Sequence, residues 1–373
     1  MKKSVITAAA VLFLIAVSSG ERIFPRMTEI TLAEPVFVLG VDKSGDKVKL
    51  SVIYEKIEES DEGSGNPNKK YAVSTEASSS AAALQELKKQ FPREIAVSAA
   101  EYFLIGEEAA KEGVSKYVDY LSKERNLRLT ASVFVVKGDS GRAAEILADR
   151  KTLDTLRNYG ENAGINAFSS QMAFYELLSS LAKTGNNDTG FAVPALVTFE
   201  GNGGVSVRPG GYAIIKNGVL AGFLDDSAAR GYNIMKNKSV YSAIEIAGRA
   251  DLPNSAVKLE TAGCNFSFAF NRDKLTEITV NIDIFTSAAD YGNSDYSERE
   301  LNLFAEKEQG RVIYSEAREL INASKLYGCD FLRFGDAIRM RHPYKWEKLK
   351  DNWDNIYMNT PVRINVNSNI SSR

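Results

Sequence analysis

Few residues in this chain are suited to catalysis. Its single histidine, His342, stands just before a proline. A triad hydrolase needs such an imidazole as its base, with a nucleophilic serine in reach. The one suggestive serine is Ser140, in the string Gly138-Asp139-Ser140-Gly141. This string follows an expected strand and opens a short expected helix, so we interpret it as a turn with a helix N-cap at Asp139 or Ser140.

Other chemical signatures are weak. The sequence has no GxxxxGK[ST] phosphate loop, and its glycines at 201, 203 and 204 do not fit GxGxxG. Catalytic zinc usually draws on several histidines. The acidic runs 58–62 and 107–108 are typical of a solvated surface. We therefore expect no enzyme, no cofactor and no metal. A hydrolase using two carboxylates stays open, because the fold sets the spacing of such a pair.

Composition describes an ordinary globular protein. The 373 residues suffice for two or three domains. Lys and Arg total 46 against 48 Asp and Glu, a formal net charge of −2, so we expect no nucleic-acid partner. The two cysteines, Cys264 and Cys329, lie outside any CxxC or Cys/His array. We expect them to stay reduced; the alternative disulfide would stabilise the fold by about 4 kcal/mol.

The amino terminus has the layout of a secretory signal peptide. A basic start, Met1-Lys2-Lys3, precedes the apolar run Val5–Val17, and small residues follow up to Gly20. A helix over this run would span about 20 Å, short of the roughly 30 Å hydrocarbon core of a bilayer. We therefore predict that residues 1–20 are a signal peptide, with an uncleaved N-terminal anchor as the alternative. Either predicts export.

The elements that position the remaining residues mix strands and helices without a regular βαβ repeat. A turn at 42–46 joins two expected strands into a hairpin, and a proline at 92 ends an expected helix. We take this segment, 21–189, as an N-terminal α+β domain. Periodicity predicts strands over 35–41, 48–54, 97–105 and 129–137, and helices over 79–90, 115–124, 142–149 and 170–183.

Two further domains are expected after residue 189. Asn217-Gly218 predicts a tight hairpin, which we place in a small middle α+β domain, 190–254. Long alternating strands within 258–285, a helix over 297–326, a second over 330–341 and a strand over 362–366 predict a C-terminal α+β domain, 255–373. The predicted fold is therefore a three-domain α+β protein with antiparallel-rich sheets.

Two tryptophans lie seven residues apart near the carboxyl terminus. Trp346 and Trp353 stand close to Tyr344 and Tyr357. They could anchor a partner protein, because aromatic residues dominate binding hot spots. They could equally fill the core between the helix before Pro343 and the last strand. We take the core role as the expectation.

A series of short motifs follows the long helix: Tyr-Gly-x-Asp, Phe-Gly, Pro-x-x-Trp and Asn-Trp. With that order, the chain resembles the Ger(x)C family of spore germination proteins, the C subunits of germinant receptors. The segments 39–42, 103–110, 128–129, 211–216, 222–224 and 229–232 are similar to that family too. The motif positions are Tyr327, Gly328, Asp330, Phe334, Gly335, Pro343, Trp346, Asn352 and Trp353.

The resemblance implies a three-domain α+β protein on the outer face of the spore inner membrane. There it would work with two multi-pass membrane subunits in sensing germinants and starting germination; contact with the small-molecule germinant itself is left open. No catalytic residue or cofactor is implied, and the motif residues would be structural or would contact partners. An exported solute-binding protein, with a deep cleft between domains, is the alternative.

One position departs from the family pattern. Members usually carry a lipobox cysteine at the end of the signal, whereas Glu21 stands there in this chain. Lipid attachment needs that thiol. We therefore predict retention at the membrane surface by partner subunits, together with an N-terminal anchor if the signal is not cleaved.

Overall fold

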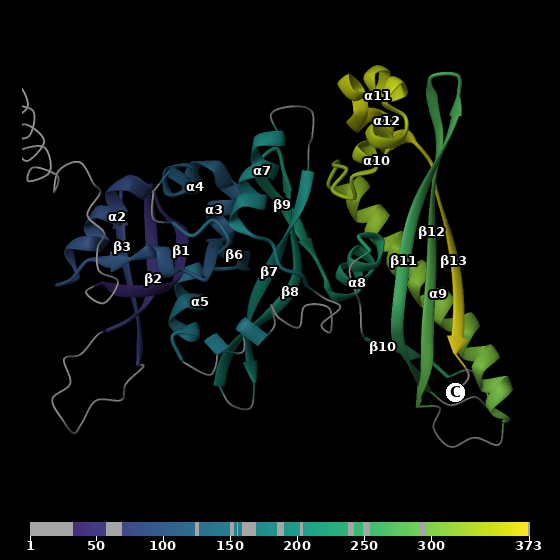
Figure 1. Cartoon of the computed structure of the whole chain (residues 1–373), viewed down its shortest axis with the longest axis horizontal. Coiled ribbons are helices and arrows are strands. Elements are labelled where there is room, and N and C mark those ends of the chain that lie inside the picture. Colours follow the sequence, from purple (N-terminus) through teal and green to yellow (C-terminus); the bar gives the residue numbers. More distant parts are fainter. Residues whose placement is uncertain are drawn as a thin grey trace, which may run out of the picture.

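Two β-sheets carry the architecture of the described chain (Figure 1). One sheet has nine strands and the other has four. The predicted signal segment, 1–20, lies outside the described residues. Among the residues that the structure describes, no helix is both long and apolar enough to cross a membrane. The computed structural model describes residues 33–56, 69–123, 127–149, 153–154, 156–158, 169–184, 190–201, 204–237, 242–248, 254–290 and 296–371.

The first sheet begins with the predicted hairpin, which is confirmed. Strand β1 (Glu34–Ser44) pairs antiparallel with β2 (Lys47–Glu55), and β2 pairs antiparallel with β3 (Lys70–Ala77). A short strand, β4 (Ile95–Ala96), lies parallel to the start of β1. These strands form one flank of the sheet.

The centre of this sheet is parallel, which the sequence did not predict. β1, β5 (Tyr102–Gly106), β6 (Ser132–Lys137) and β7 (Gly190–Gly201) run in the same direction. β5 and β6 are shorter than expected: residues 97–99 form a 3-10 turn and 129–130 a turn. Such short strands, joined by short crossover helices, hide the βαβ period in the sequence.

Helices cover both faces of the first sheet. α2 (Ser80–Lys89), α3 (Glu107–Glu112), α4 (Val114–Lys123) and α7 (Phe174–Thr184) bury apolar residues on one face. α5 (Ser140–Leu147) covers the other face, with Leu153 and Leu156. The predicted limits of α2 are confirmed, since Ser79 is its N-cap and Gln90 its C-cap. The central strands are thus apolar on both sides.

Three strands complete the sheet at its other flank. β7 pairs antiparallel with β8 (Gly204–Lys216), which pairs antiparallel with β9 (Val219–Leu224). The predicted hairpin at Asn217-Gly218 is confirmed, with φ of 51° and 79° at these residues, the backbone that Asn and Gly tolerate best. Because β7 also pairs with β6, these strands extend the first sheet.

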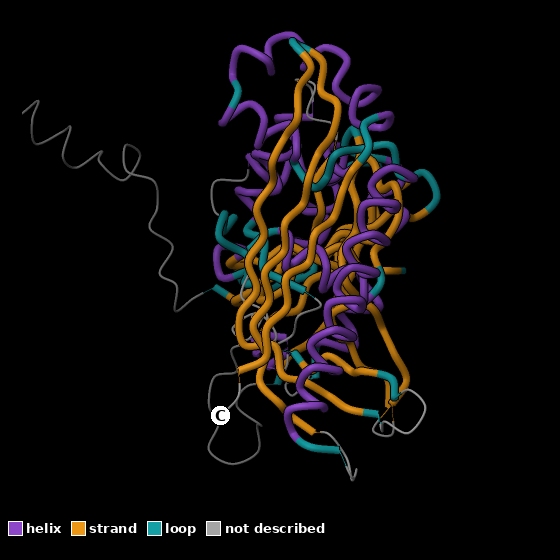
Figure 2. The backbone as a smooth tube through the Cα atoms, turned by 90° about the vertical axis from the view of Figure 1, so that its right-hand side faces the viewer, coloured by secondary structure: helices purple, strands orange, loops and turns teal. Residues whose placement is uncertain are grey.

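The second sheet is built on one long hairpin. β11 (Ser255–Asn271) and β12 (Lys274–Asp290) each have 17 residues, and β10 (Ala243–Ile246) and β13 (Val362–Ser371) flank them. β13 is parallel to β12. The predicted long helix is confirmed as α9 (Glu298–Leu326), which begins with a capping box of Ser297 and Glu300 and lies along the sheet (Figure 2).

One apolar core joins the two sheets. It combines residues of β7 and β8 with residues of α8 (Asp226–Met235), β11, β12 and α9. A buried ion pair, Arg230 with Glu316, links α8 to α9. The chain then forms α10 (Phe334–Arg341), α11 (Pro343–Leu349) and α12 (Trp353–Asn359) at one end of the second sheet (Figure 1). Cys264 and Cys329 are both free thiols.

Candidate functional site

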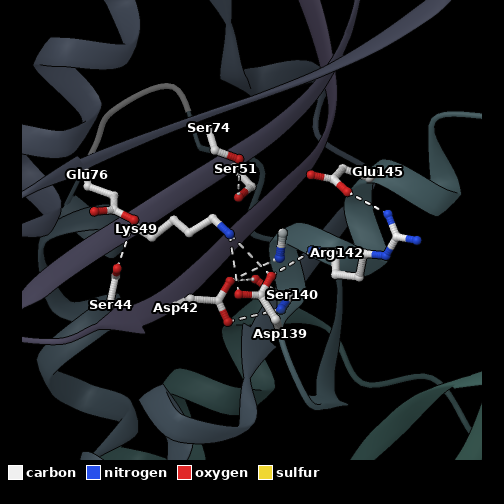
Figure 3. A network of polar contacts seen from close by, with 11 residues as sticks. Asp42, Ser44, Lys49, Ser51, Ser74, Glu76, Asp139, Ser140, Arg142 and Glu145 are labelled. Carbon is white, nitrogen blue, oxygen red and sulfur yellow. Dashed lines mark hydrogen bonds and ion pairs between the residues drawn. The ribbon is translucent and has the colours of Figure 1, made fainter.

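A polar cluster lies where the parallel strands β1, β5 and β6 end (Figure 3). The Asp42 carboxylate, near the end of β1, accepts hydrogen bonds from the backbone of Ser140 (2.9 Å), from the Ser140 hydroxyl (2.5 Å) and from the backbone of Gly141 (3.0 Å). Ser140 and Gly141 are the first two residues of α5 (Ser140–Leu147). The predicted N-cap is confirmed at Asp139, which accepts from the backbone N–H of Arg142 (2.6 Å). We call Asp42, Ser140 and Gly141 the Asp42 node.

Glycines make room for this node. A Cβ atom at Gly106, the last residue of β5, would lie 1.6 Å from Asp42 Oδ1. One at Gly40 would lie 2.8 Å from Ser140 Oγ, and one at Gly141 would lie 2.7 Å from Lys49 Nζ. Three segments singled out in the sequence, 39–42, 103–110 and 138–141, therefore meet here.

The Asp42 carboxylate is buried, and an ion pair lies beside it. Burial raises the pKa of Asp42 above its ordinary value, against the hydrogen bonds from Ser140, which lower it. Lys49 Nζ, from β2, lies 3.3 Å from both carboxylate oxygens of Asp139. Sequence analysis did not predict this Lys49–Asp139 pair, because its members lie 90 residues apart.

The geometry of the Asp42 node suits a structural role, because it connects the end of β1 to the start of α5. The Ser140 hydroxyl donates to Asp42 and the residue is fully buried, so this oxygen is not presented to a substrate. His342 lies elsewhere, edge-on to the rings of Phe270 (5.2 Å) and Phe268 (6.3 Å). In many open α/β sheets the ends of parallel strands bind a ligand at a helix N-terminus. Here the chain's own carboxylate occupies the first N–H groups of α5.

The family-like motif forms a second node around Asp330. Its carboxylate accepts from the backbone of Phe334 (3.0 Å), the backbone of Gly335 (2.7 Å) and the indole N–H of Trp353 (3.0 Å). Burial raises the pKa of Asp330 to about 7, against these hydrogen bonds, which lower it. We call these four residues the Asp330 node. It fixes the start of α10 and ties it to α12.

The two tryptophans enclose the glycine of this node. The rings of Trp346 and Trp353 meet edge to face at 5.4 Å. A Cβ atom at Gly335 would lie 2.8 Å from Trp353 Nε1 and 2.9 Å from Trp346. Trp353 is buried in the shared core, and Trp346 is partly buried against it. Pro343 is the first residue of α11 and Asn352 directly precedes α12, and neither hydrogen-bonds to Asp330.

The first motif residues join the second sheet unit to the first sheet. The Tyr327 hydroxyl, at the end of α9, donates to the carbonyl oxygen of Phe223 in β9 (3.0 Å). Its ring lies against Gly222, where a Cβ atom would be 2.6 Å from it. Gly328 follows with φ of 64°, which suits glycine. Cys329 is buried against Gly190, the first residue of β7. We call this contact the Tyr327 junction.

Two protein-family models match this chain, one over each half. The model described as "Spore germination protein N-terminal domain" matches residues 26–194, and "Spore germination B3/ GerAC like, C-terminal" matches residues 210–373. Spore germination protein KC of Bacillus subtilis (strain 168) is 24% identical over 327 residues, covering 79% of this chain and 77% of that protein. The crystal structure of the GerBC protein aligns with a TM-score of 0.55 at 13% identity, over 90% of this chain and 97% of that chain. This likeness concerns the fold.

Proposed function

Since the chain belongs to the GerAC-like family of spore germination proteins, we propose that it is the non-enzymatic C subunit of a germinant receptor complex, acting at a membrane surface. One observation carries the proposal: both family models match, in chain order, over 26–194 and 210–373. The receptor role extends what the family implies to this chain. Its partners would be the multi-pass membrane subunits of that complex.

The structure supports a role in protein–protein coupling. The Tyr327 junction and the shared core hold the two sheets in contact through α8 and α9. The buried carboxylates of both nodes already accept three hydrogen bonds each from the chain itself. Both nodes are therefore satisfied within the fold, which favours a structural role for them over ligand binding.

The alternative, a solute-binding protein, needs a deep cleft between domains. In the described part of the chain, a cavity of about 550 Å³ lies along β10 and the start of β11, where Glu245, Asn254 and Asp290 line it. The space between the two sheets is filled by the apolar side chains of the shared core. These observations favour the receptor-subunit proposal.

The proposal is tested in spores of the native organism. Spores lacking the gene should lose the response to at least one germinant, measured as dipicolinate release, and the wild-type gene should restore it. Crosslinking in intact spores, followed by purification of this chain, should recover polytopic membrane proteins. A protein recovered alone, with germination unchanged for every germinant tried, would overturn the proposal and turn the search to small-molecule ligands.

A further inference from the structure

Two highly exposed apolar side chains lie at one end of the molecule. Met340, near the end of α10, is 74% exposed, and Tyr344, in the first turn of α11, is 88% exposed. Figure 1 shows α11 and the turn of the β11–β12 hairpin at this same end. Single exposed apolar residues are common on protein surfaces, so the charges around these two decide how to interpret them.

Four cations lie at this end. Arg272 lies in the hairpin turn and Lys274 begins β12, whereas Arg341 and Lys345 adjoin the two apolar residues in sequence. None of the four forms an ion pair within the described part of the chain. Arg341 donates to the carbonyl oxygen of Phe266, and Lys345 Nζ donates to the carbonyl oxygen of Arg272 at 2.9 Å. A carbonyl oxygen accepts a hydrogen bond but carries no net charge, so the positive charges of Arg341 and Lys345 stay uncompensated.

The acidic side chains nearby already have basic partners. Asp273 pairs with Lys348 at 2.6 Å, and Asp336 pairs with both Arg333 and Arg339. Glu347 and Asp351 both raise the pKa of Lys350, the first through a hydrogen bond. This end is therefore locally positive in a chain whose formal net charge is −2.

The end is also preformed. Lys345 Nζ lies 4.1 Å from the centre of the Phe270 ring, and the same ring meets His342 edge-on at 5.2 Å. These contacts and the Lys348–Asp273 pair hold α11 against the hairpin. A surface whose contacts form before binding loses less entropy when it binds.

We propose that this tip (Arg272, Lys274, Met340, Arg341, Tyr344 and Lys345) binds the anionic headgroups of a lipid surface. Each cation near a negative leaflet strengthens binding about fivefold, and an exposed tyrosine beside apolar surface suits the headgroup boundary. A protruding tip fits a bilayer, whereas an acidic protein segment would favour a groove. The cavity described above lies at the opposite end of β11, at Asn254 and Ser255. The inference rests on the proposed membrane-surface function for its setting.

The charge contribution is tested with the full chain and vesicles of phosphatidylcholine, with and without phosphatidylglycerol. The test variant combines Arg272→Asn with Lys274→Gln; asparagine tolerates the φ of 54° at position 272. We expect co-sedimentation with the anionic vesicles to weaken at least about tenfold. The control combines Arg299→Gln with Lys307→Gln, which removes the same charge from exposed sites on α9. It should leave binding unchanged.

The apolar contribution is tested by combining Met340→Gln with Tyr344→Ser. We expect a several-fold loss of binding, while Leu326→Gln, at a residue 82% exposed on α9, should have no effect. The same amino-terminal segment is present in every variant, so differences between variants report the tip. Equal losses in test and control variants, or binding to polyglutamate but not to vesicles, would overturn the proposal. Crosslinking in spores measures receptor assembly separately, so a failure of one proposal leaves the other standing.

Discussion

The Asp42 node and the Asp330 node both supply an acceptor for backbone N–H groups at the start of a helix, but from different distances along the chain. In each, a buried carboxylate accepts two backbone N–H groups at the start of a helix and one side-chain donor. Asp330 reaches N–H groups four and five residues ahead, whereas Asp42 reaches α5 from 98 residues away. A short-range node leaves a motif in the sequence. A long-range node leaves only scattered glycines and an aspartate.

The two nodes differ also in what surrounds them. Lys49 and Asp139, both partly exposed, lie beside the Asp42 node. The Asp330 node lies among the rings of Phe334, Trp353 and Tyr357, and the ion pair beside it, Arg333 with Asp336, lies at the start of α10. We expect the Asp330 node to respond more strongly to loss of its carboxylate, because the Trp353 indole N–H is held among packed rings, whereas the Ser140 hydroxyl can rotate to another acceptor.

The largest effect is expected for Asp330→Ala. It leaves two backbone N–H groups and the Trp353 indole N–H buried without an acceptor, each costing about 1–3 kcal/mol. We expect the free energy of unfolding to fall by about 4 kcal/mol, measured by urea denaturation. Asp351→Ala, at an exposed aspartate close in sequence, is the control and should change it by less than about 0.5 kcal/mol. A cost below about 1 kcal/mol for Asp330→Ala would contradict the proposed role of the node.

The second-largest effect is expected for Asp42→Ala, which should lower the free energy of unfolding by about 3 kcal/mol. It orphans two backbone N–H groups, but the Ser140 hydroxyl can rotate to another acceptor. The same urea titration measures it. If Asp42→Ala proved costlier than Asp330→Ala, the comparison between the nodes would be reversed, and the long-range tie would be the more important one.

A third prediction concerns packing at the Asp42 node. Gly106→Ala places a Cβ atom onto Asp42, so we expect a loss of about 2 kcal/mol. Gly263→Ala is the matched control, because a Cβ atom at that strand position meets nothing within 4 Å. Similar unfolding midpoints for the two variants would show that the close approach at Gly106 is relaxed in solution.

The pH dependence sharpens the comparison further. Because burial raises the pKa of Asp330 to about 7, the folded protein binds this proton more tightly than the unfolded chain does. Its contribution to stability is complete below about pH 4 and is lost as the pH rises through about 7. Asp330→Asn should therefore flatten the decline of the unfolding midpoint between about pH 5 and pH 8. An unchanged slope would show that other buried carboxyls, such as Glu316, cause the decline.

The smallest effect is expected at the Tyr327 junction. Tyr327→Phe keeps the ring against Gly222 and removes the hydrogen bond to the Phe223 carbonyl oxygen, at a cost of about 1 kcal/mol. The same variant should reduce the germination response more than Tyr314→Phe, at an exposed tyrosine of α9, if the junction transmits signals between the sheets. Equal germination by both variants would assign the junction a purely structural role.

Local signals explain what the sequence predicted well. The hairpin at Asn217-Gly218, the start of α2 at Ser79 and the limits of α9 depend on neighbouring residues, and all are confirmed. Strand order depends on contacts between distant segments, so the parallel pairings of β1 with β5 and of β12 with β13 were not foreseen. The same reason explains the nodes: the motif around Asp330 was singled out as a set, whereas the contact of Asp42 with Ser140 was not.

The parallel pairing of β13 with β12 has a consequence for synthesis. The hairpin of β11 and β12 leaves the ribosome about 70 residues before β13 does. Until then one edge of β12, rich in isoleucine and valine, has no partner strand, and such edges invite pairing with other chains. All strands of the first sheet precede residue 225, so its hydrogen-bonded strands can pair during translation. The side chains of β7 and β8 that face the shared core still await α8, α9 and the second sheet. The nascent protein thus passes through a state in which the first sheet is paired, while the edge of β12 and the apolar face of the shared core are both uncovered.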